Sequence, residues 1–118
     1  MILVVDDNEL NLALTRAVLE RAGYEVEAAR SGADAVSSIE RRRPDLVLMD
    51  VQLPDRDGLE VTRDLKSEPA TSDITIVALT AHAMVGDEDT ALAAGCAGYI
   101  CKPIDTRIFA DEVGRFLK

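Results

Sequence analysis

Short apolar runs alternate with amphipathic stretches along the whole chain. The runs at residues 2–5, 46–49 and 74–79 are rich in aliphatic side chains, and residues 98–101 form a further short run. Such runs are typical of parallel strands that are buried on both faces. Residues 24–28 instead alternate apolar and charged side chains, which predicts an edge strand with one exposed face. We therefore expect five strands.

Helical patterns fill the intervals between these strands. The first, residues 8–22, places Leu14, Val18 and Ala22 on one stripe that we expect to face inward. Three further helices are expected after Ser31, at about residues 59–68 and at 85–94.

A final helix is expected after Asp105, which we interpret as its N-cap. The residues of its expected apolar face are Ile108, Phe109, Val113, Phe116 and Leu117.

The alternation of strand and helix, repeated about five times, predicts one α/β fold. Right-handed crossovers then place helices on both faces of a parallel sheet and bring the carboxyl ends of the strands to one edge. The polar residues at these strand ends are Asp6, Asp7, Asp50, Thr80 and Lys102. We expect them to lie close together.

Length and charge limit what this edge can bind. The chain has 118 residues, 47% of them hydrophobic, which suits one domain over residues 1–118. A net charge of −9 and 3% aromatic content argue against nucleic-acid and anionic-membrane partners. No apolar run reaches membrane-spanning length and no signal peptide is recognised. We expect a cytoplasmic protein in which Cys96 and Cys101 are reduced thiols.

The residue types at the edge suit phosphoryl chemistry. Carboxylates from two strands make a hard-oxygen site for Mg²⁺, a lysine and a hydroxyl can contact phosphoryl oxygens, and an aspartate can accept the phosphoryl group covalently. Taken alone, Asp6-Asp7 suits a helix N-cap as well as a metal site.

Five motifs, in order and at consistent spacing, resemble the receiver domain of two-component response regulators over essentially the whole chain. They are Val4-Val5-Asp6-Asp7-Asn8, Leu48-Met49-Asp50-Val51-Gln52-Leu53-Pro54-Asp55, Asp57-Gly58, Leu79-Thr80-Ala81 and Tyr99-Ile100-Cys101-Lys102-Pro103. The resemblance implies a flavodoxin-like, doubly wound, five-stranded parallel sheet with strand order 2-1-3-4-5.

The resemblance also implies roles for the edge residues. Asp50 would accept a phosphoryl group from a phosphohistidine of a histidine kinase or histidine phosphotransfer protein. Asp7, Asp50 and the backbone carbonyl of Gln52 would bind Mg²⁺, with Asp6 acting largely through water and charge. Lys102 would pair with Asp50 at rest and with the phosphoryl oxygens afterwards. Such a protein is not an ordinary enzyme, but it catalyses its own phosphorylation and autodephosphorylation.

The output side of the resemblance involves other residues. Thr80 and Tyr99 would form the switch that changes binding of a downstream protein, and the bond before Pro103 would be cis. The positions that tune the lifetime of the phosphoryl group would be Gln52, Ala81 and His82.

Three alternatives remain at this point. The chain resembles receivers attached to hybrid histidine kinases too, and would then be a phosphorelay intermediate. An aspartyl phosphatase would place its nucleophile in a D-x-D pattern on the first strand, which Asp6-Asp7 lacks. A flavin-binding flavodoxin would need hydroxyls and glycines at the same place.

Overall fold

The computed structural model describes residues 1–80, 87–102 and 104–117, so Ala81, His82 and Pro103 lie outside the described residues. The strands are β1 (Ile2–Val5), β2 (Val26–Ala29), β3 (Leu46–Asp50), β4 (Thr75–Thr80) and β5 (Gly98–Cys101). The helices are α1 (Glu9–Arg21), α2 (Gly32–Arg41), α3 (Gly58–Ser67), α4 (Asp87–Ala94) and α5 (Phe109–Phe116).

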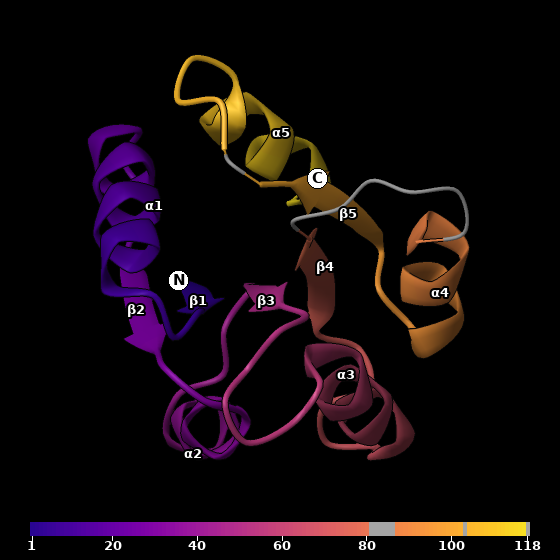
Figure 1. Ribbon diagram of the computed structural model, residues 1–118. Helices are drawn as coiled ribbons and strands as arrows, with labels where there is room; N and C mark the ends of the chain where they lie inside the picture. Colours follow the sequence, from indigo (N-terminus) through magenta and orange to yellow (C-terminus); the bar gives the residue numbers. More distant parts are fainter. Residues whose placement is uncertain (81–86, 103, 118) are drawn as a thin grey trace.

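All strand pairs are parallel, and the order is β2-β1-β3-β4-β5. The predicted fold class and strand order are therefore confirmed. Helices α1 and α5 cover one face of the sheet, and α2, α3 and α4 cover the other (Figure 1). β2 lies at an edge, as its alternating sequence predicted.

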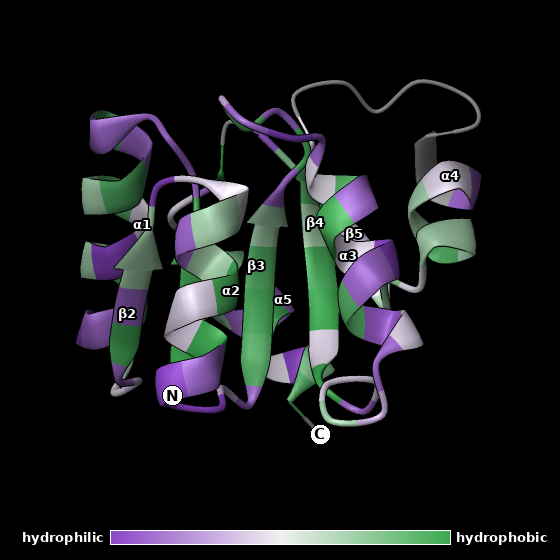
Figure 2. Ribbon diagram, turned by 90° about the horizontal axis from the view of Figure 1, so that it is seen from below, coloured by the Kyte–Doolittle hydropathy of each residue, from purple (hydrophilic) through white to green (hydrophobic). Residues whose placement is uncertain are grey.

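Each face of the sheet carries its own hydrophobic core. Leu3 and Val5 pack with α2 and α3, whereas Ile2 and Val4 pack with α1 and α5. Strands buried on both faces have little room for polar side chains, and Figure 2 shows β3 and β4 as largely hydrophobic with polar loops at their ends. In the described part of the chain, no helix combines the length and apolar character needed to cross a membrane.

Strand register brings the polar strand ends together. Val5 lies opposite Met49, and Thr80 lies opposite Cys101. The residues that follow Val5, Met49 and Cys101 therefore emerge at the same edge of the sheet as Thr80 itself. The side chains that reach this edge are Asp6, Asp50, Thr80 and Lys102.

The predicted inward stripe of α1 is wrong for Leu14 and Ala22, whereas Val18 packs partly buried against the core. Leu12, Thr15 and Leu19 are buried, while Leu14 is 44% exposed and Ala22 is exposed at the C-cap. Apolar residues occur all around this helix, so helical periodicity did not single out one face. Packing against the sheet and α5 selected the face that carries Leu12 and Leu19.

The predicted start of the last helix is also wrong. α5 begins at Phe109, and Asp105 instead accepts the backbone N–H of Arg107 in the preceding turn at 3.0 Å. Ile108, expected on the apolar face, is 48% exposed. Phe109 and Val113 form the fully buried part of that face.

Gly58 begins α3 where the helix contacts the backbone of β3. A β-carbon at this position would stand 1.9 Å from the carbonyl oxygen of Asp50. The Gly58 N–H also donates to the carbonyl of Val51 at 2.9 Å. A residue without a side chain is needed here because the helix must approach Asp50 this closely.

We predict that Gly58→Ala lowers the free energy of unfolding by at least about 2 kcal/mol, because backbone must shift to admit the methyl group. Gly114→Ala is the control, since its β-carbon would meet only the Tyr24 hydroxyl, at 3.2 Å, and alanine favours a helix interior by about 1 kcal/mol. Urea denaturation measures both. Equal stability of the two variants would contradict the close approach at Gly58.

Candidate functional site

The carboxyl edge of the sheet contains an open depression of about 410 Å³. It lies over the ends of β1 and β3, where the strand order reverses and where ligands of doubly wound folds bind. Its lining residues are Asp6, Asp7, Asn8, Asn11, Asp50, Gln52 and Lys102. Three of these are acidic and one is basic, so the depression combines cation ligands with a group that binds anions.

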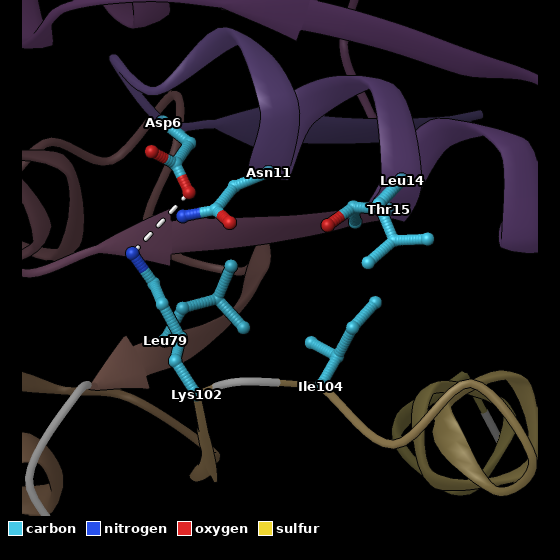
Figure 3. Close-up of a pocket in the computed structure, with 7 residues that line it drawn as sticks. All are labelled: Asp6, Asn11, Leu14, Thr15, Leu79, Lys102 and Ile104. Carbon is cyan, nitrogen blue, oxygen red and sulfur yellow. Dashed lines mark ion pairs between the residues drawn. The ribbon is translucent and has the colours of Figure 1, made fainter.

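Lys102 lies between two buried carboxylates. Its Nζ is 2.9 Å from Oδ2 of Asp50 and 3.2 Å from Oδ2 of Asp6. Figure 3 shows the ammonium directed toward Asp6, with Asn11 of α1 beside the pair. The structure thus brings together side chains from the ends of three strands.

Backbone amides hold the second oxygen of each buried carboxylate. The N–H of Asn8 donates to Oδ1 of Asp6 at 2.9 Å, and that of Gln52 donates to Oδ1 of Asp50 at 3.0 Å. Both oxygens of Asp6 therefore already have partners. These contacts fix the orientation of the carboxylates without any ligand.

Three carboxylates form a cluster that suits a hard cation. Oxygens of Asp6, Asp7 and Asp50 lie within 4.8 Å of one another. Asp7 is exposed, while the other two are buried. Mg²⁺ is commonly bound by one or two carboxylates together with water, so the donor set fits this ion.

Burial raises the pKa of Asp50, and the Asp6 carboxylate raises it further, although the Gln52 N–H and Lys102 oppose both. For Lys102, burial lowers the pKa, but the hydrogen bond and charge of Asp50, together with Asp6, outweigh it and leave the pKa raised. The ammonium stays charged, yet it does not fully offset the cost of ionising Asp50. A further cation bound next to Asp50 would lower the cost of ionising its carboxyl group.

Thr80 and Tyr99 lie next to the acidic cluster on the side of α4. Thr80 is buried at the end of β4, and Tyr99 is partly buried on β5. Both line a cavity of about 250 Å³, together with Gln52 and Ala91. The cavity provides space beside Tyr99 for a change of side-chain position.

Two residues that stood in the receiver-like motifs were given no role in the sequence interpretation. Asn8 is the N-cap of α1, and its N–H positions Asp6; its place before a helical pattern was a usable signal. Asp55 accepts hydrogen bonds from the backbone of α2. No local pattern marks this contact because the partners lie more than twenty residues apart in the sequence.

The chain matches the family described as the response regulator receiver domain over residues 2–113. The polar-differentiation response regulator DivK of Brucella anthropi is 43% identical over 116 residues, which cover 98% of this chain and 94% of that protein.

Solved structures have the same fold. The receiver domain of sensor histidine kinase PA1611 from Pseudomonas aeruginosa, with a magnesium ion in its active-site cleft, is 37% identical with a TM-score of 0.88, covering 98% of this chain and 95% of that one. The chemotaxis response regulator CheY4 of Vibrio cholerae is 26% identical with a TM-score of 0.91, covering 98% and 96%.

We predict that Asp50→Asn stabilises the Mg²⁺-free protein at neutral pH by on the order of 1 kcal/mol. The raised pKa of Asp50 means that folding disfavours its ionised form, and Asp6 still pairs with Lys102 in the variant. Denaturant unfolding across a pH series measures the difference from wild type.

The sign of the pH dependence follows from linkage. The advantage of Asp50→Asn is full above the folded-state pKa of Asp50 and vanishes below its ordinary value of 3.8. Glu40→Gln, which removes an exposed carboxylate, controls for net charge. An Asp50→Asn advantage that does not shrink on acidification would contradict the assignment.

Proposed function

The chain belongs to the response regulator receiver domain family of two-component signalling proteins, and from this membership we propose that it is a phosphorylation-activated switch with Asp50 as the acceptor. The observation that carries the proposal is the position of Lys102 between the buried carboxylates of Asp50 and Asp6. Lys102 pairs with the proposed nucleophile, Asp50, and is close enough to pair with the oxygens of a phosphoryl group attached there.

In the proposed reaction, a carboxylate oxygen of Asp50 attacks the phosphorus of a phosphohistidine. A P–O bond forms as the P–N bond breaks, and the imidazole nitrogen leaves with the bonding electron pair and is then protonated. Lys102 would stabilise the negative charge on the phosphoryl oxygens. Catalysis of phosphoryl transfer comes mostly from such electrostatic stabilisation and from positioning of the reacting groups. Hydrolysis of the resulting acyl phosphate returns Asp50 to its carboxylate.

Receiver domains typically bind Mg²⁺ at an acidic site, and the cluster of Asp6, Asp7 and Asp50 fits this ion. We propose that Asp7, Asp50 and the backbone carbonyl of Gln52 hold it. Asp6 would contribute charge and water contacts, and its carboxylate stays oriented by the Asn8 N–H and Lys102. When bound, Mg²⁺ supplies positive charge that offsets the charge of the phosphoryl oxygens.

The proposed switch uses the residues on the other side of Asp50. Thr80 would move to contact the phosphoryl oxygens, and Tyr99 would turn into the cavity of about 250 Å³ that both residues line. A bound group shifts an equilibrium only between conformations that it contacts differently. Thr80 is placed to contact the phosphoryl group in one conformation and not in the other. The changed surface of α4, β5 and α5 would then bind a downstream protein.

The donor would be a histidine kinase or a histidine phosphotransfer protein in the cytoplasm. The likeness to the receiver domain of sensor histidine kinase PA1611 favours a second candidate, a receiver module that passes its phosphoryl group along a phosphorelay. The roles proposed for Ala81 and His82 in tuning the lifetime, and the cis bond before Pro103, stay predictions because these residues lie outside the described part.

We predict that wild type with Mg²⁺ and acetyl phosphate gains the mass of one phosphoryl group, whereas Asp50→Asn gains none because it lacks the nucleophile. Lys102→Ala should react about 10²-fold more slowly, the usual cost of removing one charge-stabilising group. Intact-mass spectrometry measures each rate, and Glu40→Gln is the control for lost surface charge.

Chelation of Mg²⁺ with EDTA should abolish the gain in mass. Phosphorylation of Asp50→Asn at the wild-type rate would contradict the proposal. Rapid multiple turnover of the phosphodonor would instead indicate a phosphatase, and a yellow purified protein would indicate a flavodoxin.

We predict that Thr80→Ala is phosphorylated but does not switch, because the hydroxyl that contacts the phosphoryl group is missing. Thr80→Ser retains the hydroxyl and should switch normally. The amide NMR shifts of Tyr99 and Ile108, recorded before and after phosphorylation, measure the response. A full response in Thr80→Ala would remove Thr80 from the mechanism.

A further inference from the structure

Asp55 joins the loop between β3 and α3 to a different element of the fold. Its Oδ1 accepts the N–H of Gly32 at 2.8 Å, and its Oδ2 accepts the N–H of Ala33 at 3.0 Å. These are the first two N–H groups of α2, which have no partner within the helix. The loop runs beside the end of α2 in Figure 1.

The start of α2 is thus capped from two directions. Ser31, the local N-cap, accepts the N–H of Asp34 at 3.0 Å through its hydroxyl, and Asp55 supplies the remaining contacts. The hydrogen bonds from Gly32 and then Ala33 hold the pKa of Asp55 below its ordinary value. Asp55 is ionised at neutral pH, and the two hydrogen bonds hold its carboxylate in place although the residue is exposed.

The backbone of α2 is shaped for this contact. A β-carbon at Gly32 would stand 2.9 Å from Cγ2 of Val61 and 3.4 Å from Oδ1 of Asp55. A larger residue would push α2 away from α3 and from the loop. Glycine at this position lets the carboxylate reach the helix.

The same loop carries Gln52, whose position matters for the cation site. The ends of the loop are fixed by the hydrogen bond from Gly58 to Val51 and by a short bridge between Gln52 and Asp57. Its middle is anchored by Asp55 on α2 and by the partly buried side chain of Leu53. At the start of the loop, the N–H of Gln52 also donates to the Asp50 carboxylate at 3.0 Å. In the middle of the loop, Asp55 is the anchor that combines a charge with two hydrogen bonds.

We infer that Asp55 is a positioning residue, which fastens the loop to α2 and so holds the backbone carbonyl of Gln52 in place for Mg²⁺. This inference rests on the proposed function, in which that carbonyl is a ligand. A backbone carbonyl is aimed by the path of its loop, so a contact three residues away can set its direction. Groups that orient metal ligands in this way contribute substantially to metal affinity.

The test compares Mg²⁺ affinity in Asp55→Ala and two matched variants. Ser31→Ala weakens the cap of the same helix without touching the loop, and Asp34→Asn removes a charge from the same helix end. We expect Asp55→Ala to bind Mg²⁺ about tenfold more weakly, at the lower end of what loss of a supporting group costs. Ser31→Ala and Asp34→Asn should bind like wild type.

Calorimetric titration with MgCl₂ gives the affinities, and the amide NMR shift of Gln52 reports the loop directly. Asp55→Ala should move this resonance in the absence of Mg²⁺, whereas Ser31→Ala should not. If Asp55→Ala does not fold, Asp55→Asn, which retains one acceptor oxygen, takes its place and should show a smaller loss of the same kind.

The outcomes separate the two proposals. Failure of wild type to bind Mg²⁺ would overturn the proposed cation site itself. If wild type binds Mg²⁺ and the Asp55 variants show the same affinity and the same Gln52 resonance, the proposed function stands. Asp55 would then be only a helix cap. An equal loss of affinity in Ser31→Ala would also overturn the inference, since the effect would then come from α2 alone.

Discussion

Lys102 lies within ion-pair distance of two buried carboxylates that would otherwise repel each other, and the charge balance at the strand ends depends on this contact. Burying the two carboxylates costs more free energy than their attraction to one ammonium group restores. The raised pKa of Asp50 reflects this imbalance. The site is consequently poor as a stabilising feature. It is well suited to recruit a cation and a phosphoryl group, each of which changes the charge balance around Asp50.

The N-terminal ends of three helices help to orient the side chains and loops of the site. Because strands and helices alternate in a parallel sheet, the N-termini of α1, α2 and α3 lie at the same edge as the carboxyl ends of the strands. Asn8 caps α1, Asp57 caps α3, and Asp55 reaches across to α2. The caps that stabilise the helices therefore also fix the loops that carry the ligands.

The two wrong expectations have a common origin. In α1 the apolar residues face several directions, and contact with the sheet and α5 decided that Leu12 and Leu19 are buried while Leu14 is not. At α5, a helical pattern and a capping aspartate were present, but Asp105 closes a separate turn. Local sequence offered more than one solution in each case, and the energy of tertiary packing distinguished between them.

The sequence by itself determined the strand runs and the strand-end residues, because hydrophobic periodicity and the handedness of crossovers leave few arrangements for such a chain. Asp50 and Lys102 were placed at one edge by that argument alone. The strand order followed from the resemblance of the sequence motifs to receiver domains. Only the tertiary structure decided that Lys102 reaches Asp6 as well, that α3 must meet Asp50 at Gly58, and that Asp55 caps α2. These contacts join segments that are distant in sequence or depend on exact backbone approach, and no local periodicity encodes either.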